Sequence, residues 1–216
     1  MDRLSALSIQ PRDRFGIAAR ATFVGLAIIA ALALGACDKK DAVDGDPPSR
    51  TNGAKTTKKA VSTDAFCDVH FAGDQGPLMK VPEVAQKEAI VPAAGGWHWF
   101  NVWATWCKPC VEEMPRLVKW RDKLRGEGKK LEVSFISVDE SETEIGAFRK
   151  DHAAAPASAR LVDLKGQEAW FKELGLDGNP PIPIHVFVAP SGHIRCARAG
   201  SVREQDYAAI EALLAE

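Results

Sequence analysis

The sequence predicts an α/β protein, a three-layer sandwich with a mixed central sheet, and three observations support this fold class. Apolar and β-branched segments of strand length alternate with segments in which apolar residues recur at helical spacing. Near the carboxyl end, two strand-like segments are separated only by the turn Ala189–Gly192, which is typical of an antiparallel hairpin. A last helical segment follows that hairpin. Strands alternating with helices, closed by a hairpin and a helix, pack as helices on a mixed sheet.

The first half of the sandwich contains two strands, each followed by a helix. Trp97–Ala104 is apolar, aromatic and β-branched, which is the composition of a buried strand. Val111–Arg125 has apolar residues at helical spacing, and Leu131–Val138 is predicted to be the next strand. Ser141–Glu144 has the pattern of a capping box, so we expect a helix from there to about His152.

The second half ends in the hairpin. Arg160–Leu164 is predicted to be a short strand and Gln167–Leu174 a short helix. Ile184–Val188 and His193–Ala199 are the two strands of the hairpin. A second capping box, Ser201–Glu204, is expected to open the last helix. The residues of that helix expected to face the core are Tyr207, Ile210, Leu213 and Leu214.

Residues 66–95 precede the sandwich and are expected to add a small hairpin, an N-terminal β extension of the sheet. Cys67 alternates with apolar residues in one strand-like run and Cys196 in another, so both should point inward. Buried free cysteine is common, whereas an oxidising compartment favours a second disulfide. Both alternatives for this pair stay open.

The first 36 residues are predicted to be a lipoprotein signal peptide. Four arginines in the first 20 residues form a positive region, and residues 21–34 are uncharged and mostly apolar. Leu34-Gly35-Ala36-Cys37 resembles a lipobox, in which the signal is cut before a cysteine that receives lipid. The alternative is an uncleaved membrane helix, but the uncharged stretch from residue 21 to 37 has 17 residues. That is short against the roughly 20 residues needed to span a bilayer.

The rest of the chain is expected to divide into a flexible tether, residues 37–63, and one folded domain, residues 64–216. The tether is rich in Asp, Lys, Pro, Gly, Ser and Thr and has almost no large apolar residue, so it cannot bury enough surface to order itself. The whole chain has 28 basic and 29 acidic residues, and no basic face stands out. Nucleic acid is therefore excluded as an expected partner.

The tetrapeptide Cys107-Lys108-Pro109-Cys110 lies where a predicted strand meets a predicted helix. Cys107 would sit at the helix N-terminus, where free N–H groups and the helix dipole lower the pKa of a thiol. Cys110 would lie one turn further along the same face but deeper. An exposed thiolate that attacks and a shielded thiol that resolves are the requirements of disulfide exchange.

The dithiol has two other interpretations. A Cys-x-x-Cys pair can be half of a zinc site, but zinc would need two more ligands at comparable spacing. The histidines are scattered singly, at His70, His98, His152, His185 and His193. A purely structural disulfide is the other alternative, although so short a loop is strained for that task. The strand, the helix and the preceding tryptophan favour the redox interpretation.

The stretch from Asn101 to Pro115, with its pattern W-A-T-W-C-x-P-C-x-E-E-M-P, resembles the thioredoxin superfamily and, more narrowly, its TlpA/ResA-like periplasmic branch. The resemblance covers about the last 150 residues, roughly one domain. It implies a thioredoxin fold and thiol–disulfide exchange, with Cys107 as the nucleophile and Cys110 as the resolving thiol.

The resemblance also implies a cis-proline opposite the dithiol, just before the first strand of the hairpin. Counting back from the hairpin turn selects Pro183, preceded by Ile182, with Pro181 as the second choice. Cis peptide bonds are almost confined to X-Pro, and an ordinary proline-rich loop is the alternative. With Trp106 and Pro109, Ile182 and Pro183 are the expected substrate-binding residues.

Two polar positions set this chain apart from cytoplasmic thioredoxin. Where thioredoxin buries an aspartate six residues before the nucleophile, this chain has Asn101, which cannot ionise. Glu113 lies one turn beyond Cys110 and matches the acidic residue of the TlpA/ResA-like branch. It is expected to accept or return the proton of Cys110, and to tune the dithiol rather than hold the fold together. The alternative is an exposed helix residue like Glu112.

These features predict a membrane-tethered thiol–disulfide oxidoreductase that reduces disulfides in exported proteins, including apocytochrome c by the resemblance. The expected location is the cell envelope of a bacterium, on the periplasmic face of a membrane, with a lipid anchor on Cys37. No Gly-rich dinucleotide loop follows a strand, so no cofactor is expected and a membrane thiol donor should supply the electrons. We expect a monomer.

Other functions compete with this one. A thiol oxidase or isomerase of the same fold differs in its reduction potential, and Lys108 favours the reduced, thiolate form. A copper-handling lipoprotein would use a Cys-x-x-x-Cys spacing with a partner histidine, and here the spacing is one residue shorter. A peroxidase of the superfamily would need a Thr-x-x-Cys setting, whereas Trp106 directly precedes Cys107.

Overall fold

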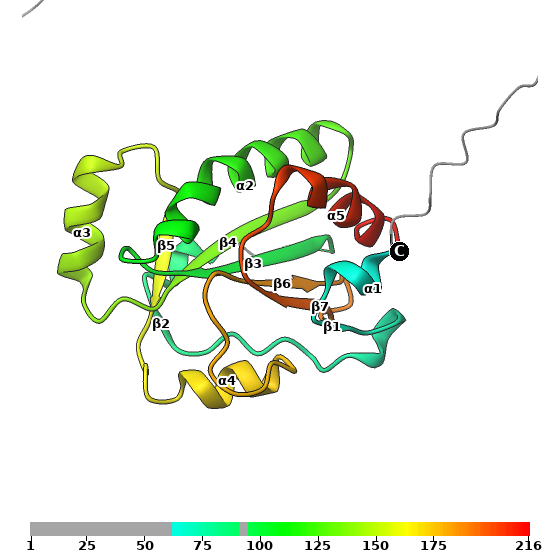
Figure 1. The fold of residues 1–216 in the computed structure, drawn as a ribbon, viewed down its shortest axis with the longest axis horizontal. Helices are drawn as coiled ribbons and strands as arrows, with labels where there is room; N and C mark the ends of the chain where they lie inside the picture. Colours follow the sequence, from blue (N-terminus) through cyan, green and yellow to red (C-terminus); the bar gives the residue numbers. More distant parts are fainter. Residues whose placement is uncertain (1–61, 91–94) are drawn as a thin grey trace, which may run out of the picture. The chain divides into compact units, whose positions relative to one another are not determined.

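A mixed sheet of seven strands forms the centre of the fold, between helices (Figure 1). The computed structural model describes residues 62–90 and 95–216, which lie in a compact unit spanning residues 55–216. The strands are β1 Val69–His70, β2 Val84–Ala85, β3 Trp97–Trp103, β4 Leu131–Ser137, β5 Ser158–Leu161, β6 Ile184–Val188 and β7 Ile194–Ala199. The α-helices are α1 Thr63–Phe66, α2 Lys108–Gly126, α3 Glu142–Asp151, α4 Gln167–Glu173 and α5 Tyr207–Leu213. The 3-10 helices are η1 Gly73–Gln75, η2 Lys87–Ala89 and η3 Glu204–Asp206.

The strand order is β1-β7-β6-β3-β4-β5-β2. Strands β3, β4 and β5 are parallel, while the pairs β3/β6, β6/β7, β1/β7 and β2/β5 are antiparallel, so the sheet is mixed as predicted. Strand β3 lies at the centre and all seven of its residues are buried. Its almost continuous apolar sequence follows from that position, because a strand covered on both faces has no solvent side.

Helices cover both faces of the sheet. Figure 1 shows α2 and α5 on one side and α4 on the other, which confirms the three-layer sandwich. Helix α2 presents one buried stripe at helical spacing, as an amphipathic helix on a sheet must. The residues of that stripe are Cys110, Glu113, Met114, Leu117, Trp120 and Leu124.

The N-terminal β extension exists, but the hairpin expected from residues 66–95 is wrong. Strands β1 and β2 do not pair with each other: β1 joins β7 at one edge of the sheet and β2 joins β5 at the other. Each strand has only two residues and covers the unpaired backbone groups of a longer edge strand. A long connection between β1 and β2 therefore crosses from one edge to the other.

One of the two expected capping boxes forms. Ser141 caps α3 through the backbone N–H of Glu144, and the Glu144 side chain accepts from the Ser141 N–H, as predicted. The box expected at Ser201–Glu204 is wrong. There the Arg203 N–H donates to Asp206 at 2.7 Å, and the turn η3 precedes α5. The backbone N–H of Val202, inside the expected box, instead donates to the buried carboxylate of Glu113 on α2.

The two remaining cysteines are bonded to each other. Cys67 follows α1 and Cys196 lies on β7, with an S–S distance of 2.03 Å and a Cα–Cα distance of 5.5 Å. The prediction that they are adjacent is confirmed, and of the two alternatives left open the disulfide is present. It closes a sequence separation of 129 residues and ties the start of the domain to the sheet.

The expected signal peptide, residues 1–36, the lipid site Cys37 and all but the last two residues of the tether lie outside the described residues. Helix α1 begins at Thr63, where the tether was expected to end. Within residues 62–90 and 95–216, no helix is both long and apolar enough to cross a membrane.

Candidate active site

The redox pair lies at the start of α2. Cys107 is the N-cap residue of this helix, and the backbone N–H of Cys110 donates to its Sγ at 3.3 Å. The two sulfurs are bonded at 2.04 Å. Pro109 fits the first turn because its missing N–H would have had no partner there. The predicted placement at the strand-to-helix junction is confirmed.

The two cysteines differ in access to solvent. Cys107 is 5% exposed, whereas Cys110 is fully buried. The Sγ of Cys107 also lies 3.7 Å from the carbonyl oxygen of Ile182. The sulfur of Cys107 is therefore the more accessible of the two.

The peptide bond between Ile182 and Pro183 is cis, so the first of the two proline assignments is confirmed and Pro181 is not the cis residue. A groove of about 560 Å³ opens beside this segment and the dithiol. Its lining comes from Trp106–Pro109 and Asn179–Ile182, with Val138 and Gln167. Trp106, 68% exposed, is the large apolar side chain that stands out of this wall into solvent.

A buried aspartate that the sequence analysis did not select holds the turn before Cys107. Asp139, fully buried just after β4, accepts from the Thr105 backbone N–H at 3.0 Å and from its hydroxyl at 2.7 Å. The Ser137 hydroxyl donates to the other carboxylate oxygen at 2.5 Å. One signal could have found it: β3 and β4 are parallel neighbours, so the residues that follow each strand meet at the same sheet edge.

Glu113 is buried, so the alternative of an exposed helix residue is wrong. Its side chain is 1% exposed and accepts from Asn101 Nδ2 at 3.1 Å and from the Val202 backbone N–H at 2.9 Å. Glu112 is the exposed neighbour, and it lies 3.7 Å from the ammonium of Lys108. The expected asparagine and glutamate are thus in direct contact behind the redox pair.

His185 completes this buried group. It lies on β6 opposite Asn101 of β3, and its Nε2 is 3.3 Å from Oε1 of Glu113. In the sequence His185 is one of five singly placed histidines, and its closeness to Pro183 suits it to the partner histidine of the copper-handling alternative. Its ring contacts Glu113 and Trp99 instead. In the part of the chain that the structure describes, no group of three His, Cys, Asp or Glu residues could hold a metal ion.

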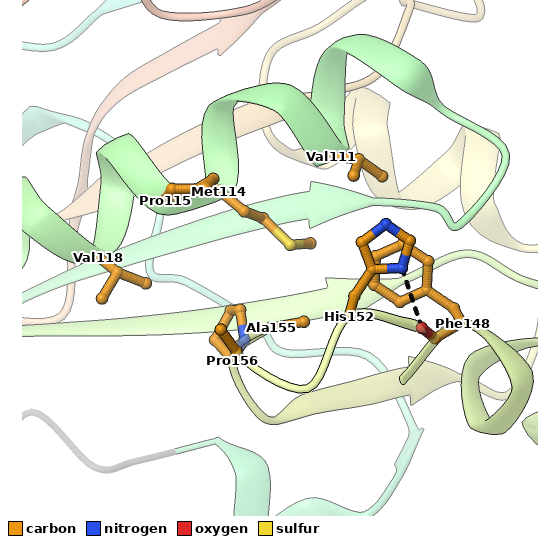
Figure 2. Close-up of a pocket in the computed structure, with 9 residues that line it drawn as sticks. Val111, Met114, Pro115, Val118, Phe148, His152, Ala155 and Pro156 are labelled. Carbon is orange, nitrogen blue, oxygen red and sulfur yellow. Dashed lines mark hydrogen bonds between the residues drawn. The ribbon is translucent and has the colours of Figure 1, made fainter. Parts of the chain in front are cut away.

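A second hollow, of about 320 Å³, lies between α2 and the end of α3 (Figure 2). Val111, Met114 and Val118 of α2 face Phe148 of α3 and His152, the residue that follows α3, and the segment Ala154–Pro156 also lines the hollow. The His152 ring stacks on Phe148 at 4.0 Å and its Nδ1 lies 3.0 Å from the Phe148 carbonyl oxygen. This hollow is apolar and contains neither cysteine of the redox pair.

Comparison with known proteins agrees with this site. The chain is 34% identical over 98 residues to the thioredoxin-like protein YneN of Bacillus subtilis, which is 45% of this chain and 56% of YneN. It is 28% identical over 123 residues to the thiol-disulfide oxidoreductase ResA of Bacillus thuringiensis, which is 56% of this chain and 66% of ResA. The chain thus spans less than two thirds of the length of either relative.

The chain is also similar to parts of solved structures. A thioredoxin-related protein from Neisseria meningitidis serogroup B is 28% identical, with a TM-score of 0.44 over 56% of this chain and 83% of that one. A thiol:disulfide interchange protein from Chlorobium tepidum is 21% identical, with a TM-score of 0.45 over 56% of this chain and 82% of that one. The sequence pattern of the AhpC/TSA family matches residues 72–197, which is more than half of the chain and includes the dithiol, Glu113 and Pro183. This protein therefore belongs to the AhpC/TSA family, and its fold is thioredoxin-like.

Proposed function

We propose that this protein is a thiol–disulfide oxidoreductase that reduces disulfides in exported proteins. The observation that carries the proposal is the Cys107–Cys110 pair at the N-terminus of α2, beside the groove and the carbonyl of Ile182. A dithiol of this kind passes electrons without a bound cofactor. The names of the relatives ResA and YneN support the same class of activity.

The reaction consists of two exchanges. The Cys107 thiolate attacks one sulfur of a substrate disulfide, which forms a mixed disulfide and releases the first substrate thiolate. Cys110 then loses its proton and its thiolate attacks the Cys107 sulfur. This second step forms the Cys107–Cys110 disulfide and releases the second substrate thiolate. The substrate gains two electrons, the dithiol loses two, and an external dithiol must reduce the pair again.

Glu113 is the proton acceptor for Cys110 in this proposal. Both residues belong to the buried stripe of α2 and lie one turn apart. The carboxylate oxygens are held by donors from β3 and from the segment before α5. A carboxylate fixed in this way accepts the thiol proton in the second exchange and returns it when the pair is reduced again.

The groove next to the dithiol is the substrate site in this proposal. Trp106 supplies an exposed apolar surface, Pro109 and Ile182 line the groove, and the Ile182 carbonyl lies beside the sulfur of Cys107. Pro183, joined to Ile182 by the cis bond, is proposed to hold this segment for the substrate. An extended cysteine-containing peptide fits such a groove, because backbone groups provide affinity without sequence selection. Exported proteins, including apocytochrome c, are the proposed substrates.

The amino-terminal segment supports a location at the membrane. We propose that residues 1–36 are removed, that Cys37 carries lipid and that residues 37–63 tether the domain, residues 64–216, at the periplasmic face of a bacterial membrane. The chain would work there as a monomer, and a membrane thiol donor would reduce it.

The direction of electron flow is the point on which the oxidase or isomerase alternative differs. A reduction potential of roughly −200 mV or below supports a reductant, and a value near about −120 mV supports an oxidant. Stoichiometric binding of Cu(I) by the reduced protein would instead favour the copper-handling alternative.

The experiment uses the mature protein and a disulfide-bonded test protein such as insulin. The reduced wild type should reduce insulin, whereas Cys107→Ser should not, and Cys67→Ala/Cys196→Ala should keep the activity because it leaves the redox pair intact. In cells, Cys110→Ser should retain substrates as mixed disulfides on Cys107, and mass spectrometry identifies them. Equal insulin reduction by wild type and Cys107→Ser would refute the proposal.

A further inference from the structure

The segment between β7 and α5, residues 200–203, bonds both to the redox helix and to the residues beside the dithiol. It has no regular secondary structure and leads from β7 to α5 beside α2 (Figure 1). Because such a segment has no ladder of its own, its buried backbone groups bond to other elements. The reaction proposed for the dithiol uses one of these bonds, from the Val202 N–H to Glu113, and gives the others no role.

The first residue of this segment holds Pro183. Ile184 of β6 pairs with Ala199 of β7, and one residue further along the hairpin the Gly200 N–H donates to the Pro183 carbonyl oxygen at 2.7 Å. Proline has no N–H to donate in return, so a single hydrogen bond extends the ladder at this point. Gly200 has a φ of +94°, a backbone conformation that glycine adopts much more readily than other residues.

Helix α2 binds both backbone groups of Val202, which is fully buried. Glu113 accepts from the Val202 N–H at 2.9 Å, and Nη1 of Arg116 donates to the Val202 carbonyl oxygen at 2.8 Å. Residues three positions apart on a helix lie on the same side of it, so one face of α2 holds the whole residue. The exposed Glu204 accepts from Nε of Arg116 at 3.2 Å, which orients the guanidinium toward Val202.

These contacts close a ring around the redox pair. The ring leads from α2 through Val202 to Gly200 and from Gly200 to Pro183. Ile182, the next residue back, returns it to the start of α2, since the Ile182 carbonyl oxygen lies 3.7 Å from the Sγ of Cys107. The apolar stripe of α2 holds the helix on the sheet by contacts that have no preferred direction. Hydrogen bonds do have one, so the ring fixes the helix relative to the Ile182–Pro183 segment.

We propose that Arg116 is a positioning residue for disulfide exchange with protein substrates, because its hydrogen bond to Val202 sets the Ile182–Pro183 segment against Cys107. Cys107 and Ile182 line the same groove, so a peptide that fills the groove contacts both. The substrate disulfide must lie in line with the attacking Cys107 sulfur, and a misplacement of about 1 Å lowers such a rate strongly. A small disulfide that contacts only Cys107 does not depend on this spacing. The inference deepens the proposed function and rests on it.

The first test compares two substrates in Arg116→Met, which removes the donors and keeps an unbranched apolar stem. Reduction of insulin by the reduced protein should slow by about tenfold, while reduction of hydroxyethyl disulfide should stay close to the wild-type rate. Arg116→Lys, which keeps one donor, should recover most of the insulin activity. Glu204→Gln is the control, because it leaves the bond from Arg116 to Val202 in place and should behave like the wild type with both substrates. A merely structural role would change both rates alike, and that result would overturn the proposal.

The second test changes the ring at Gly200 and uses Gly128 as its match. The two glycines have φ values of +94° and +86°, and a Cβ added at either would meet no atom within 4 Å. Gly200→Ala and Gly128→Ala should therefore lose similar stability, through backbone strain alone. Gly128 follows the end of α2 that is remote from the redox pair. Only Gly200→Ala should reduce insulin more slowly than hydroxyethyl disulfide relative to the wild type, and the same ratio in both variants would contradict the proposal.

Amide hydrogen exchange tests the ring without a substrate. The Gly200 N–H should exchange about tenfold faster in Arg116→Met than in the wild type, because the segment that presents it loses one of its anchors. The Ala189 N–H, which donates to the His193 carbonyl at the other end of the hairpin, should exchange at the wild-type rate. Unchanged exchange at Gly200 would overturn the inference even if the protein reduces insulin. Failure of the proposed function has a different signature: wild-type protein that does not reduce insulin, although exchange at Gly200 depends on Arg116.

Discussion

The carboxylate of Asp139 holds Thr105, two residues before the outer cysteine, by two hydrogen bonds of 3.0 Å to its backbone N–H and 2.7 Å to its hydroxyl. Asp139 is fully buried and follows β4, whereas Thr105 follows β3. The turn that leads into the redox pair is thus fastened to the neighbouring strand. Because an exchange reaction needs three sulfur atoms in line, this contact should affect rate as well as stability.

Asp139→Ala should therefore lower both stability and activity. The N–H of the half-buried Thr105 would lose its acceptor, which costs about 1 kcal/mol or more. The turn would also be free to move, and insulin reduction should slow by about tenfold. Thr105→Val is the matched control, since it removes only the hydroxyl and should have a smaller effect on both. Wild-type stability in Asp139→Ala, measured by urea unfolding, would contradict this role.

Cys107 should be the first cysteine alkylated in the reduced protein near neutral pH. It is the more exposed of the two and lies at the helix N-terminus, where the dipole lowers the pKa of a thiol. Peptide mapping after brief treatment with iodoacetamide measures the order. Cys110→Ser should be labelled at the wild-type rate and Cys107→Ser much more slowly. Preferential labelling of Cys110 would reverse the assigned roles.

Glu113→Gln should change the dithiol and, against the expectation from the sequence, also destabilise the fold. The side-chain amide would place an N–H against one of the donors that now bond the carboxylate, from Asn101 or from the Val202 backbone. A buried donor without an acceptor costs about 1–3 kcal/mol. Removing the negative charge should also lower the pKa of the cysteine thiols.

Thiolate absorbance during a pH titration and urea unfolding measure these two effects separately. Glu112→Gln is the matched control, because Glu112 is exposed and should leave both quantities nearly unchanged. If Glu113→Gln titrates like the wild type, water in the groove rather than Glu113 accepts the proton of Cys110.

The second disulfide should contribute stability and no chemistry. Cys67→Ala/Cys196→Ala removes a cross-link that spans 129 residues, and loss of a native disulfide costs about 2–5 kcal/mol. Denaturant unfolding of the oxidised proteins measures the difference, and the reduction potential of the Cys107–Cys110 pair should stay the same. A changed potential would mean that the two disulfides exchange with each other.

Stability should decline as the pH falls from about 6.5 toward 4, in part through His98. Burial lowers the pKa of His98 from 6.5 to about 4, so in this window the unfolded chain binds a proton that the folded protein rejects. Stability therefore rises with pH across the window, by up to about 3 kcal/mol for this one group. Urea unfolding of His98→Gln should show a shallower dependence, and an equal slope in both proteins would assign the effect to other groups.

Features that depend on neighbours in the chain were predictable. Apolar periodicity located the strand before the dithiol, helix α2 and both strands of the hairpin, and the Ser141 capping box marked the start of α3. The spacing of Cys107 and Cys110 placed them on the first turn of a helix. The resemblance to the thioredoxin superfamily implied a cis-proline, and counting back from the hairpin turn placed it at Pro183. All of these are statements about a few consecutive residues.

The positions of the two short edge strands, β1 and β2, could not be predicted from consecutive residues. Residues 66–95 contain two short segments of strand composition, and nothing in the chain between them indicates that they lie on opposite edges. Their positions follow from which edges the larger strands leave open, which is a property of the assembled sheet. The segment before α5 is a second example. The capping box expected at Ser201 does not form, and the backbone N–H of Val202 donates to Glu113 of α2, a contact that depends on how α2 packs.

The sequence by itself predicted the Cys107–Cys110 pair at the start of a helix, because that placement needs only a local motif. Only the tertiary structure decided what surrounds it. The pairs Thr105–Asp139, Asn101–His185 and Cys67–Cys196 join residues separated by 34, 84 and 129 positions. The physical reason is that a buried group is stabilised by the partner that the packed strands bring within reach, and the sequence does not state which strands are neighbours.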